Sequence, residues 1–548
     1  MSDWDRVWPR CMSGSENKSI KSFILLLRLG FSVTVFFFGI SGCTPGPSAP
    51  EAEKPEVVLP VPVLIEVLPK QEDEAFKRDT KLTLKFSLPL DPKTLTVNQE
   101  DQQCTGTVQL SADDFKTCVR LEKPVIGTDR KDFVIAPKGI YQSGRRYRLR
   151  LMEGILGSEG GQLSETENPG EFRTYSTQQL GSPGNDRGMA MALDQQGQTY
   201  VAGSTAKDGG TGLSDIFLAK FASDGRQLWI RQAGFEYLPD SCQLILLSNG
   251  LIRVIAHHSG EESSKMVIAD FNEQGEILWN RNYSFPGKSF GSAVGVDEDL
   301  NLISSGSRKA PLVSIGSKGI LAWRLNLKGR VRFEEIAVTE KLHFYAAGNV
   351  TGDFDGHSSL GKEDGILVKM HQSGIKRWSR RFGTDRNDQV VGLFDGESGV
   401  LVVLKTETSS AESKSFHTVL YRFDAEGEKI WERSLQGLLP GPALAVREIE
   451  NGHLLLAGYG SDTQKLEEGS SSGSKDENAF AARLDQDGDL VWLEIFGGKG
   501  SERALAISET PAGNVYVTGY TTGSIDGSIN EGKEDMFLVR INSEGKRF

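Results

Sequence analysis

Ala504-Leu-Ala-Ile-Ser-Glu-Thr-Pro-Ala-Gly-Asn-Val-Tyr-Val-Thr-Gly519 reads as two β-strands joined by a tight turn. Apolar residues alternate with small polar ones on both sides of a Pro-Ala-Gly-Asn sequence, which is the usual signal for a β-hairpin. A third strand is expected over Met536–Ile541, and it ends at the turn Asn542-Ser-Glu-Gly545. This stretch therefore predicts an antiparallel sheet made of strands that follow one another in the chain.

The last part of this pattern recurs along the chain at a spacing of about 50 residues, which is typical of stacked sheet units. Each copy has an apolar residue, then a glycine four residues later, then an aromatic residue four residues after the glycine. The glycines are Gly225, Gly275, Gly329, Gly374, Gly427, Gly488 and Gly545. The apolar residues are Phe221, Phe271, Leu325, Met370, Phe423, Leu484 and Ile541. The aromatic residues are Trp229, Trp279, Phe333, Trp378, Trp431 and Trp492, and the seventh copy stops at Phe548, one residue before its aromatic position.

Four short strands per unit in seven units predict an all-β chain that ends in a seven-bladed β-propeller over residues 176–548. An open linear stack is the alternative, but it would expose apolar faces at both ends. The short seventh unit favours a closed ring. Tyr175–Gly181 resembles the fourth strand Trp378–Gly383, so we expect this early segment to complete the last blade.

The repeats resemble a bacterial beta-propeller repeat family, the SBBP type, whose units read G-N-x-Y-V-x-G-x-T, then D-x-F-[VL]-x-[KR], then G-x-x-x-W. Gly197–Gly203 and Asp215–Phe221 carry this resemblance in the first unit, and Asn514–Gly519 carries it in the last. The resemblance implies a propeller fold and a location outside the cytoplasm. The family has no catalytic motif, so the resemblance implies no catalytic residue.

The N-terminus predicts export and lipid attachment. Basic residues precede the apolar run Leu29–Ile40, and small residues then lead to Cys43, as in a secretory signal that ends in a bacterial lipobox. We expect residues 1–42 to be the signal peptide, with Met12 as an alternative start, and Cys43 to carry the lipid. An uncleaved membrane anchor is the alternative, but a spanning helix needs about 20 apolar residues, more than this run offers. The expected location is the bacterial cell envelope, at the outer membrane.

Residues 43–56 are rich in Pro, Ala and Glu and predict an extended tether. Residues 57–175 follow as a separate domain, because the segments Leu82–Thr94 and Gly144–Leu151 resemble strands of a bacterial Ig-like domain. Cys104 and Cys118 bracket a short loop in it. In an exported protein they suit a disulfide, worth about 3 kcal/mol through loop entropy, although two free buried thiols are the alternative.

Candidate sites for chemistry are few. Asp485, Asp487 and Asp489 form an oxygen-rich loop that suggests Ca²⁺, but the loop falls on a hairpin turn and lacks the glutamate that completes a calcium loop. Acidic residues in turns are common, so we expect neither a metal nor a cofactor. Cys242 stands in an apolar strand and is expected to be a small core residue. No nucleophile elbow, phosphate-binding loop or zinc spacing occurs.

These observations predict a noncatalytic, lipid-anchored envelope protein whose propeller binds a protein or a glycan through its loops. A net charge of −12 argues against nucleic acid as a partner. Two alternatives stay open. The propeller is a scaffold for the assembly of other envelope proteins, or it is an enzyme with a site in its central channel. For the enzyme, Phe423–Trp431 and Leu484–Trp492 resemble tryptophan-docking motifs of quinoprotein propellers.

Overall fold

The computed structural model describes residues 59–548 with internal gaps. The gaps are residues 71–74, 101, 165–168, 207–213, 236–237, 261, 287–293, 297–300, 308–309, 318, 326–329, 340–341, 397–398, 409–414, 450–451 and 461–476. The signal peptide, Cys43 and the tether lie outside the described residues. Within the described part of the chain, no helix has the length and apolar character to cross a membrane.

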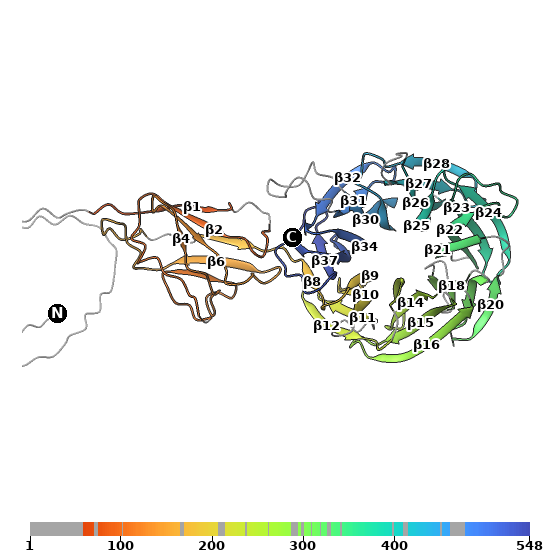
Figure 1. Cartoon of the computed structure of the whole chain (residues 1–548), viewed down its shortest axis with the longest axis horizontal. Coiled ribbons are helices and arrows are strands. Elements are labelled where there is room, and N and C mark those ends of the chain that lie inside the picture. Colours follow the sequence, from red (N-terminus) through yellow and green to blue (C-terminus); the bar gives the residue numbers. More distant parts are fainter. Residues whose placement is uncertain are drawn as a thin grey trace, which may run out of the picture. The chain divides into compact units, whose positions relative to one another are not determined.

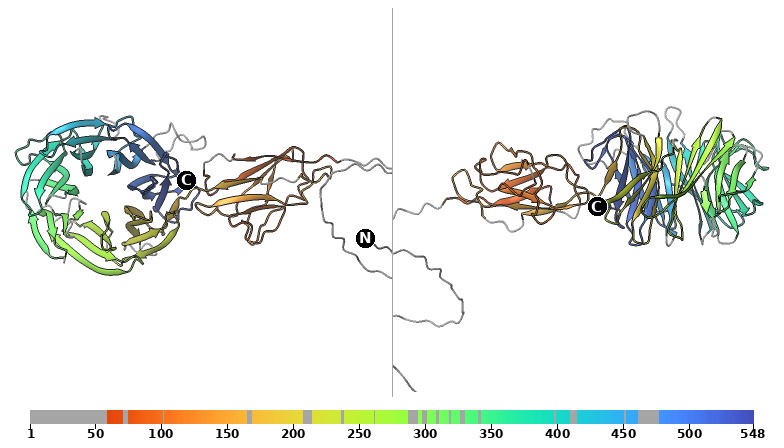
Figure 2. Two further views of the ribbon diagram at one scale, coloured as in Figure 1. Left: turned by 180° about the vertical axis from the view of Figure 1, so that it is seen from behind. Right: turned by 90° about the horizontal axis from the view of Figure 1, so that it is seen from below.

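Seven four-stranded antiparallel sheets are arranged radially in a ring, as Figures 1 and 2 show. The first blade contains β9 (Arg187–Leu193), β10 (Thr199–Ala206), β11 (Ser214–Phe221) and β12 (Gln227–Gln232), and the second contains β13 (Ser241–Leu246), β14 (Ile252–Ser259), β15 (Ser263–Phe271) and β16 (Ile277–Pro286). The third contains β17 (Val294–Val296), β18 (Leu302–Ser307), β19 (Ala310–Ile315) and β20 (Leu321–Leu325). The fourth contains β21 (Arg330–Val338), β22 (His343–Thr351), β23 (Asp364–His371) and β24 (Lys376–Phe382). The fifth contains β25 (Asp388–Gly396), β26 (Gly399–Glu407), β27 (Phe416–Phe423) and β28 (Lys429–Ser434). The sixth contains β29 (Ala443–Glu448), β30 (Leu454–Gly460), β31 (Asn478–Leu484) and β32 (Leu490–Phe496). The seventh contains β34 (Glu502–Glu509), β35 (Val515–Thr521), β37 (Asp535–Ile541) and β8 (Gln178–Leu180). The all-β propeller predicted from the repeats is confirmed.

The seventh blade confirms the predicted ring closure. Its fourth strand is β8, which comes before the first blade in the chain and pairs with β37 through Leu180 opposite Met536 and Gln178 opposite Leu538. The Gln179 side chain donates a 2.9 Å hydrogen bond to Asp535, the buried carboxylate that begins β37. In Figure 1 the C-terminus lies beside β8, and the Phe548 carbonyl accepts a 3.0 Å hydrogen bond from the Ser176 backbone. A short ribbon of β33 (Gly498–Lys499) and β36 (Ser524–Ile525) borders this blade.

The repeated glycine and tryptophan belong to the joint between neighbouring blades. Gly275 turns the chain between β15 and β16 with φ of 78°, and a Cβ atom there would lie 2.8 Å from the Trp229 ring of the preceding blade. Gly427 and Trp378 repeat this contact at 3.0 Å. The glycine therefore serves two purposes, because it adopts a positive φ and leaves room for the indole of the blade before it.

The predicted third copy of the repeat is wrong in register. The hairpin turn of the third blade is at Gly319, which follows Ile315 by four residues and precedes Trp323 by four. Leu325 instead ends β20, and Phe333 lies in the innermost strand of the next blade. Both triplets satisfy the same spacing. Packing distinguishes them, because Trp323 is the ring that stacks on the following blade at Phe344 and Gly374.

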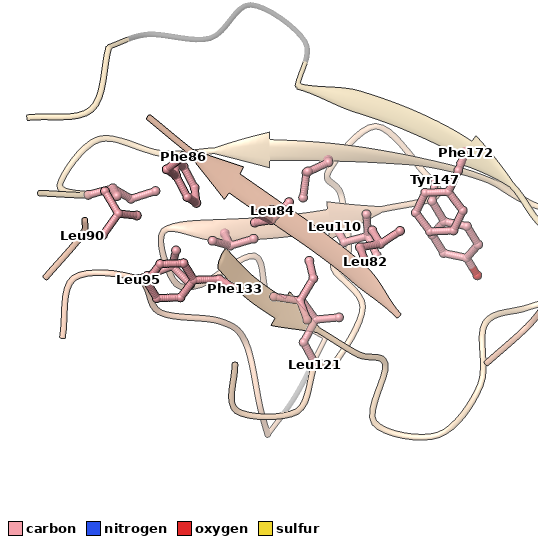
Figure 3. Close-up of a cluster of buried hydrophobic side chains, with 14 of the residues drawn as sticks. Leu82, Leu84, Phe86, Leu90, Leu95, Leu110, Leu121, Phe133, Tyr147 and Phe172 are labelled. Carbon is pink, nitrogen blue, oxygen red and sulfur yellow. The ribbon is translucent and has the colours of Figure 1, made fainter. Parts of the chain in front are cut away.

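The N-terminal domain is a β-sandwich. One sheet has the order β1 (Leu64–Leu68), β2 (Leu82–Phe86), β5 (Asp132–Ile135) and β4 (Val125–Ile126), and the other has β3 (Val108–Ser111), β6 (Arg146–Leu151) and β7 (Gly170–Arg173). Figure 3 shows the side chains of both sheets that share the core, among them Leu84, Phe133, Leu110 and Phe172. The structure contains the Cys104–Cys118 disulfide, as predicted.

Candidate functional site in the central channel

The seven innermost strands enclose a cavity of about 1500 Å³ at the centre of the ring. Every blade contributes to its wall. One lining residue from each innermost strand is, in order, Met191, Gln243, Val294, Glu335, Leu393, Arg447 and Leu505. Sites for small molecules usually measure about 300–1,000 Å³, so this channel is larger than a small-molecule site requires.

Among the described residues, a β-bulge displaces one residue of the innermost strand in five of the blades. In blades one, five, six and seven, the displaced residue is aliphatic and lines the channel. These residues are Met189, Val391, Leu444 and Leu505, and we call them the collar. In the fourth blade the displaced residue is Glu334, which hydrogen-bonds Asn349. Bulges redirect side chains and are frequent beside functional sites. The collar residues therefore line the channel because the same backbone irregularity recurs in these four blades.

The bulges account for a second set of repeated glycines. Gly203, Gly348, Gly458 and Gly519 each stand opposite a bulge on the second strand of a blade. A Cβ atom at Gly519 would lie 1.9 Å from the carbonyl oxygen of Arg503, and the other three positions are equally tight. The closing glycine of the V-x-G motif is therefore a sign, readable in the sequence, of a bulge in the adjacent innermost strand.

Cations and aromatic rings alternate at the channel end where the innermost strands begin. The Arg187 guanidinium lies 4.7 Å from the centre of the Tyr520 ring, and Tyr520 stands opposite Arg503 in the sheet. Arg503 lies 4.2 Å from the Tyr459 ring, which Lys405 approaches to 5.9 Å. We call these five residues the mouth cluster. They come from blades one, seven, six and five, the same four blades that form the collar.

Charge in the mouth cluster is not fully balanced. Arg187 donates a 2.8 Å hydrogen bond to Glu534, and Arg503 donates two to Glu477, at 3.0 and 2.6 Å. Lys405 has no ion-pair partner among the residues that the structure describes. Burial, together with the charge of Arg503, lowers the pKa of Lys405 below its ordinary value, although Glu477 opposes this. Within the described residues, the cluster thus carries one positive charge without a direct ion-pair partner.

Charged side chains line the deeper channel beyond the collar. Burial raises the pKa of Glu335 to about 8, the charge of Glu334 adds to this, and Arg447 partly offsets it. Burial lowers the pKa of Arg447, and Glu335 opposes that shift, so the two side chains interact within the channel. Toward the far end, Arg422 donates a 3.1 Å hydrogen bond to Glu448. The channel therefore runs from a cationic mouth past an aliphatic collar to the Arg422–Glu448 ion pair.

The predicted candidates lie away from the mouth cluster. Asp485 accepts hydrogen bonds from the backbone of Asp487 at 3.0 Å and of Asp489 at 2.8 Å, and Asp489 pairs with Arg433. These are the bonds of a capped hairpin turn. Within the described residues, no three His, Cys, Asp or Glu side chains are grouped so that they could hold a metal ion. Burial raises the pKa of the Cys242 thiol to about 12.

A Ser-His-Asp grouping occurs among the described residues after β22. The Ser379 hydroxyl lies 3.4 Å from His357 Nε2 and donates a hydrogen bond to Asp355. In a catalytic triad the carboxylate orients the imidazole, whereas here it holds the serine and pairs with Lys376. This arrangement secures a loop and does not activate a nucleophile.

No protein-family model and no curated protein matches this chain. Solved propellers resemble it distantly. Virginiamycin B lyase from Staphylococcus aureus is 12% identical with a TM-score of 0.39, and the match covers 66% of this chain and 99% of that one. The Neurospora crassa Pan2 WD40 domain is 9% identical with a TM-score of 0.39, over 66% and 95%. A PL25 ulvan lyase is 10% identical with a TM-score of 0.44, over 67% and 97%. Similarities this distant say nothing about what the chain binds.

Proposed function

We propose that this protein is a noncatalytic binding protein of the bacterial cell envelope that engages a macromolecular partner at the mouth of its propeller channel. The observation that carries the proposal is the mouth cluster above the collar, in which Tyr and Arg side chains are fixed in place before any partner arrives. Tyr and Arg dominate the binding energy of protein interfaces, and residues fixed in advance lose little conformational entropy on binding.

The size of the channel supports a macromolecular partner. At about 1500 Å³ it exceeds the usual volume of a cofactor site, and an inserted loop or chain end fits its open form better than an enclosed small molecule. Lipid attachment at Cys43 belongs to the same proposal, because a tethered ring samples partners near the membrane surface.

Site-specific photocrosslinking in the living cell tests this function. A photoreactive amino acid replaces Tyr459 in the mouth cluster or, as a control, Leu278 on the exposed outer strand β16. We expect one predominant crosslinked species at position 459, absent at 278 and lost when Leu505→Trp fills the collar. Equal crosslinking at both positions, or none at 459, contradicts the proposal. Protease and glycosidase digestion of the crosslinked species identifies its chemical class.

A further inference from the structure

We infer that the ligand of the channel mouth is a peptide segment of another protein, in which an acidic side chain lies close to an apolar one. This inference rests on the proposed function and adds the chemistry of the partner. It follows from the position of two features, the mouth cluster and the collar, on the same four blades.

The mouth cluster favours an anionic group. Arg503 lies 4.2 Å from the centre of the Tyr459 ring, whereas Lys405 lies 5.9 Å from it and 4.5 Å from the centre of the Phe416 ring. Among the described residues, the Glu477 carboxylate forms an ion pair with Arg503 and not with Lys405. A carboxylate placed beside Lys405 would supply the missing negative charge and relieve the repulsion between the two cations. Arg187 and Arg503 are already paired with glutamates. One or two carboxylates of the ligand therefore suffice to balance the charge of the mouth cluster, and a polyanion is not needed.

The collar favours an apolar group close to that carboxylate. Met189 and Leu505 lie two residues further along β9 and β34 than Arg187 and Arg503, which is about 6 Å deeper into the channel. Side chains two residues apart in an extended peptide lie on the same face and span a comparable distance. A leucine or phenylalanine of the ligand can therefore enter the collar while an aspartate or glutamate two residues away remains at the mouth.

The collar also distinguishes a peptide from a glycan. Sugars are recognised through hydroxyl hydrogen bonds and flat aromatic faces, and four aliphatic side chains offer neither. The Tyr459 and Tyr520 rings are each approached by a guanidinium, so those faces are already used. Aliphatic side chains that line a concave surface instead match the apolar anchors of a peptide.

Selection of short random peptides displayed on phage against the full-length, lipid-anchored protein in detergent tests the inference. We expect the selected peptides to combine Asp or Glu with Leu, Ile or Phe within three positions. Fluorescence anisotropy with one such peptide should show about tenfold weaker binding to Lys405→Glu and to Leu505→Asp. Lys405→Met removes the charge and keeps an apolar stem, so it should weaken peptide binding by an intermediate factor. This variant keeps the test valid if Lys405→Glu fails to fold.

Lys429→Glu is the matched control. Lys429 also lies 5.9 Å from a tyrosine ring, that of Tyr421, but it is on the outer strand β28. This variant has the same change of charge and should bind the peptide as the wild type does. Equal weakening by Lys429→Glu and Lys405→Glu would overturn the inference, as would selected peptides without acidic residues. A glycosidase-sensitive crosslink at position 459 would contradict the inference that the ligand is a peptide, while leaving the proposed binding function intact. Absence of any crosslink there would remove both.

Discussion

Removal of the Arg547 side chain should destabilise the propeller far more than removal of a typical surface arginine. Arg547 lies where the first and last parts of the propeller meet. Its Nε atom donates a 2.7 Å hydrogen bond to Glu494 on β32, and its Nη1 atom donates another of 2.7 Å to Asp526. The guanidinium also lies 4.5 Å from the ring of Tyr175, and Thr177 donates to the second oxygen of Asp526.

The size of the effect follows from the burial of the partners. The Asp526 side chain is 1% exposed and that of Glu494 is 25% exposed, so water can replace the guanidinium at Glu494 but not at Asp526. Removing one member of a buried ion pair costs about 3–5 kcal/mol, because the remaining charge is left without a partner. We therefore expect Arg547→Met to lower the free energy of unfolding by about 3–5 kcal/mol. Adding Asp526→Asn should restore part of this, because the uncompensated charge is removed.

Urea unfolding of the full chain, followed by tryptophan fluorescence, measures these values for the propeller transition. Arg433→Met is the control, because its partner Asp489 is 67% exposed and an exposed pair contributes about 0–1 kcal/mol. The reasoning is refuted if Arg547→Met costs no more than Arg433→Met. It is also refuted if the Arg547→Met Asp526→Asn double variant is less stable than Arg547→Met alone.

Three further predictions concern the anchor, the disulfide and the channel. Cys43→Ser should abolish palmitate labelling and move the protein out of the detergent phase, and equal labelling of both proteins contradicts the lipid anchor. Nonreducing mass mapping should join the peptides of Cys104 and Cys118, with buried Cys242 alkylated only after unfolding; alkylation of native Cys104 speaks against the bond. Burial and the charge of Glu334 raise the pKa of Glu335 from its ordinary value of 4.5 to about 8 in the folded protein, against the opposing effect of Arg447. Between pH 4.5 and about 8 only the folded state keeps this proton, so the folded protein loses stability as the pH rises through that range. Glu335→Gln should therefore raise Tm relative to the wild type at pH 8.5 and little at pH 5, and an equal difference at both values would be evidence against the shift.

The blades were predictable from the sequence because their signals are local. Gly427 and Trp431 lie within one hairpin, so spacing alone identifies the turn and the strand after it. The third copy shows the limit of this method, since Leu325 and Phe333 match the spacing although they lie in strands of two different blades. Only the contact of Trp323 with the next blade identifies the true turn.

The mouth cluster and collar were not predicted, because their members come together only when the ring closes. Lys405, Tyr459 and Arg503 belong to three different blades, and no local pattern connects them. The collar had a readable sign in Gly458 and Gly519, whose place in the strand requires a bulge opposite. These glycines indicate which residue of the opposite strand is displaced, but they do not indicate that its side chain lines the channel.

Closure of the ring by β8 sets the order in which the propeller strands can pair as the chain is synthesised. Gln179 and its partner Asp535 are separated by 356 residues, so β8 emerges before every other strand of the propeller and must wait until six complete blades have followed it. Contacts this distant in sequence form slowly, and an unpaired strand edge invites association with other chains during the delay. A chain with this architecture must therefore keep the edge of β8 from pairing with other chains until the seventh sheet is ready to receive it.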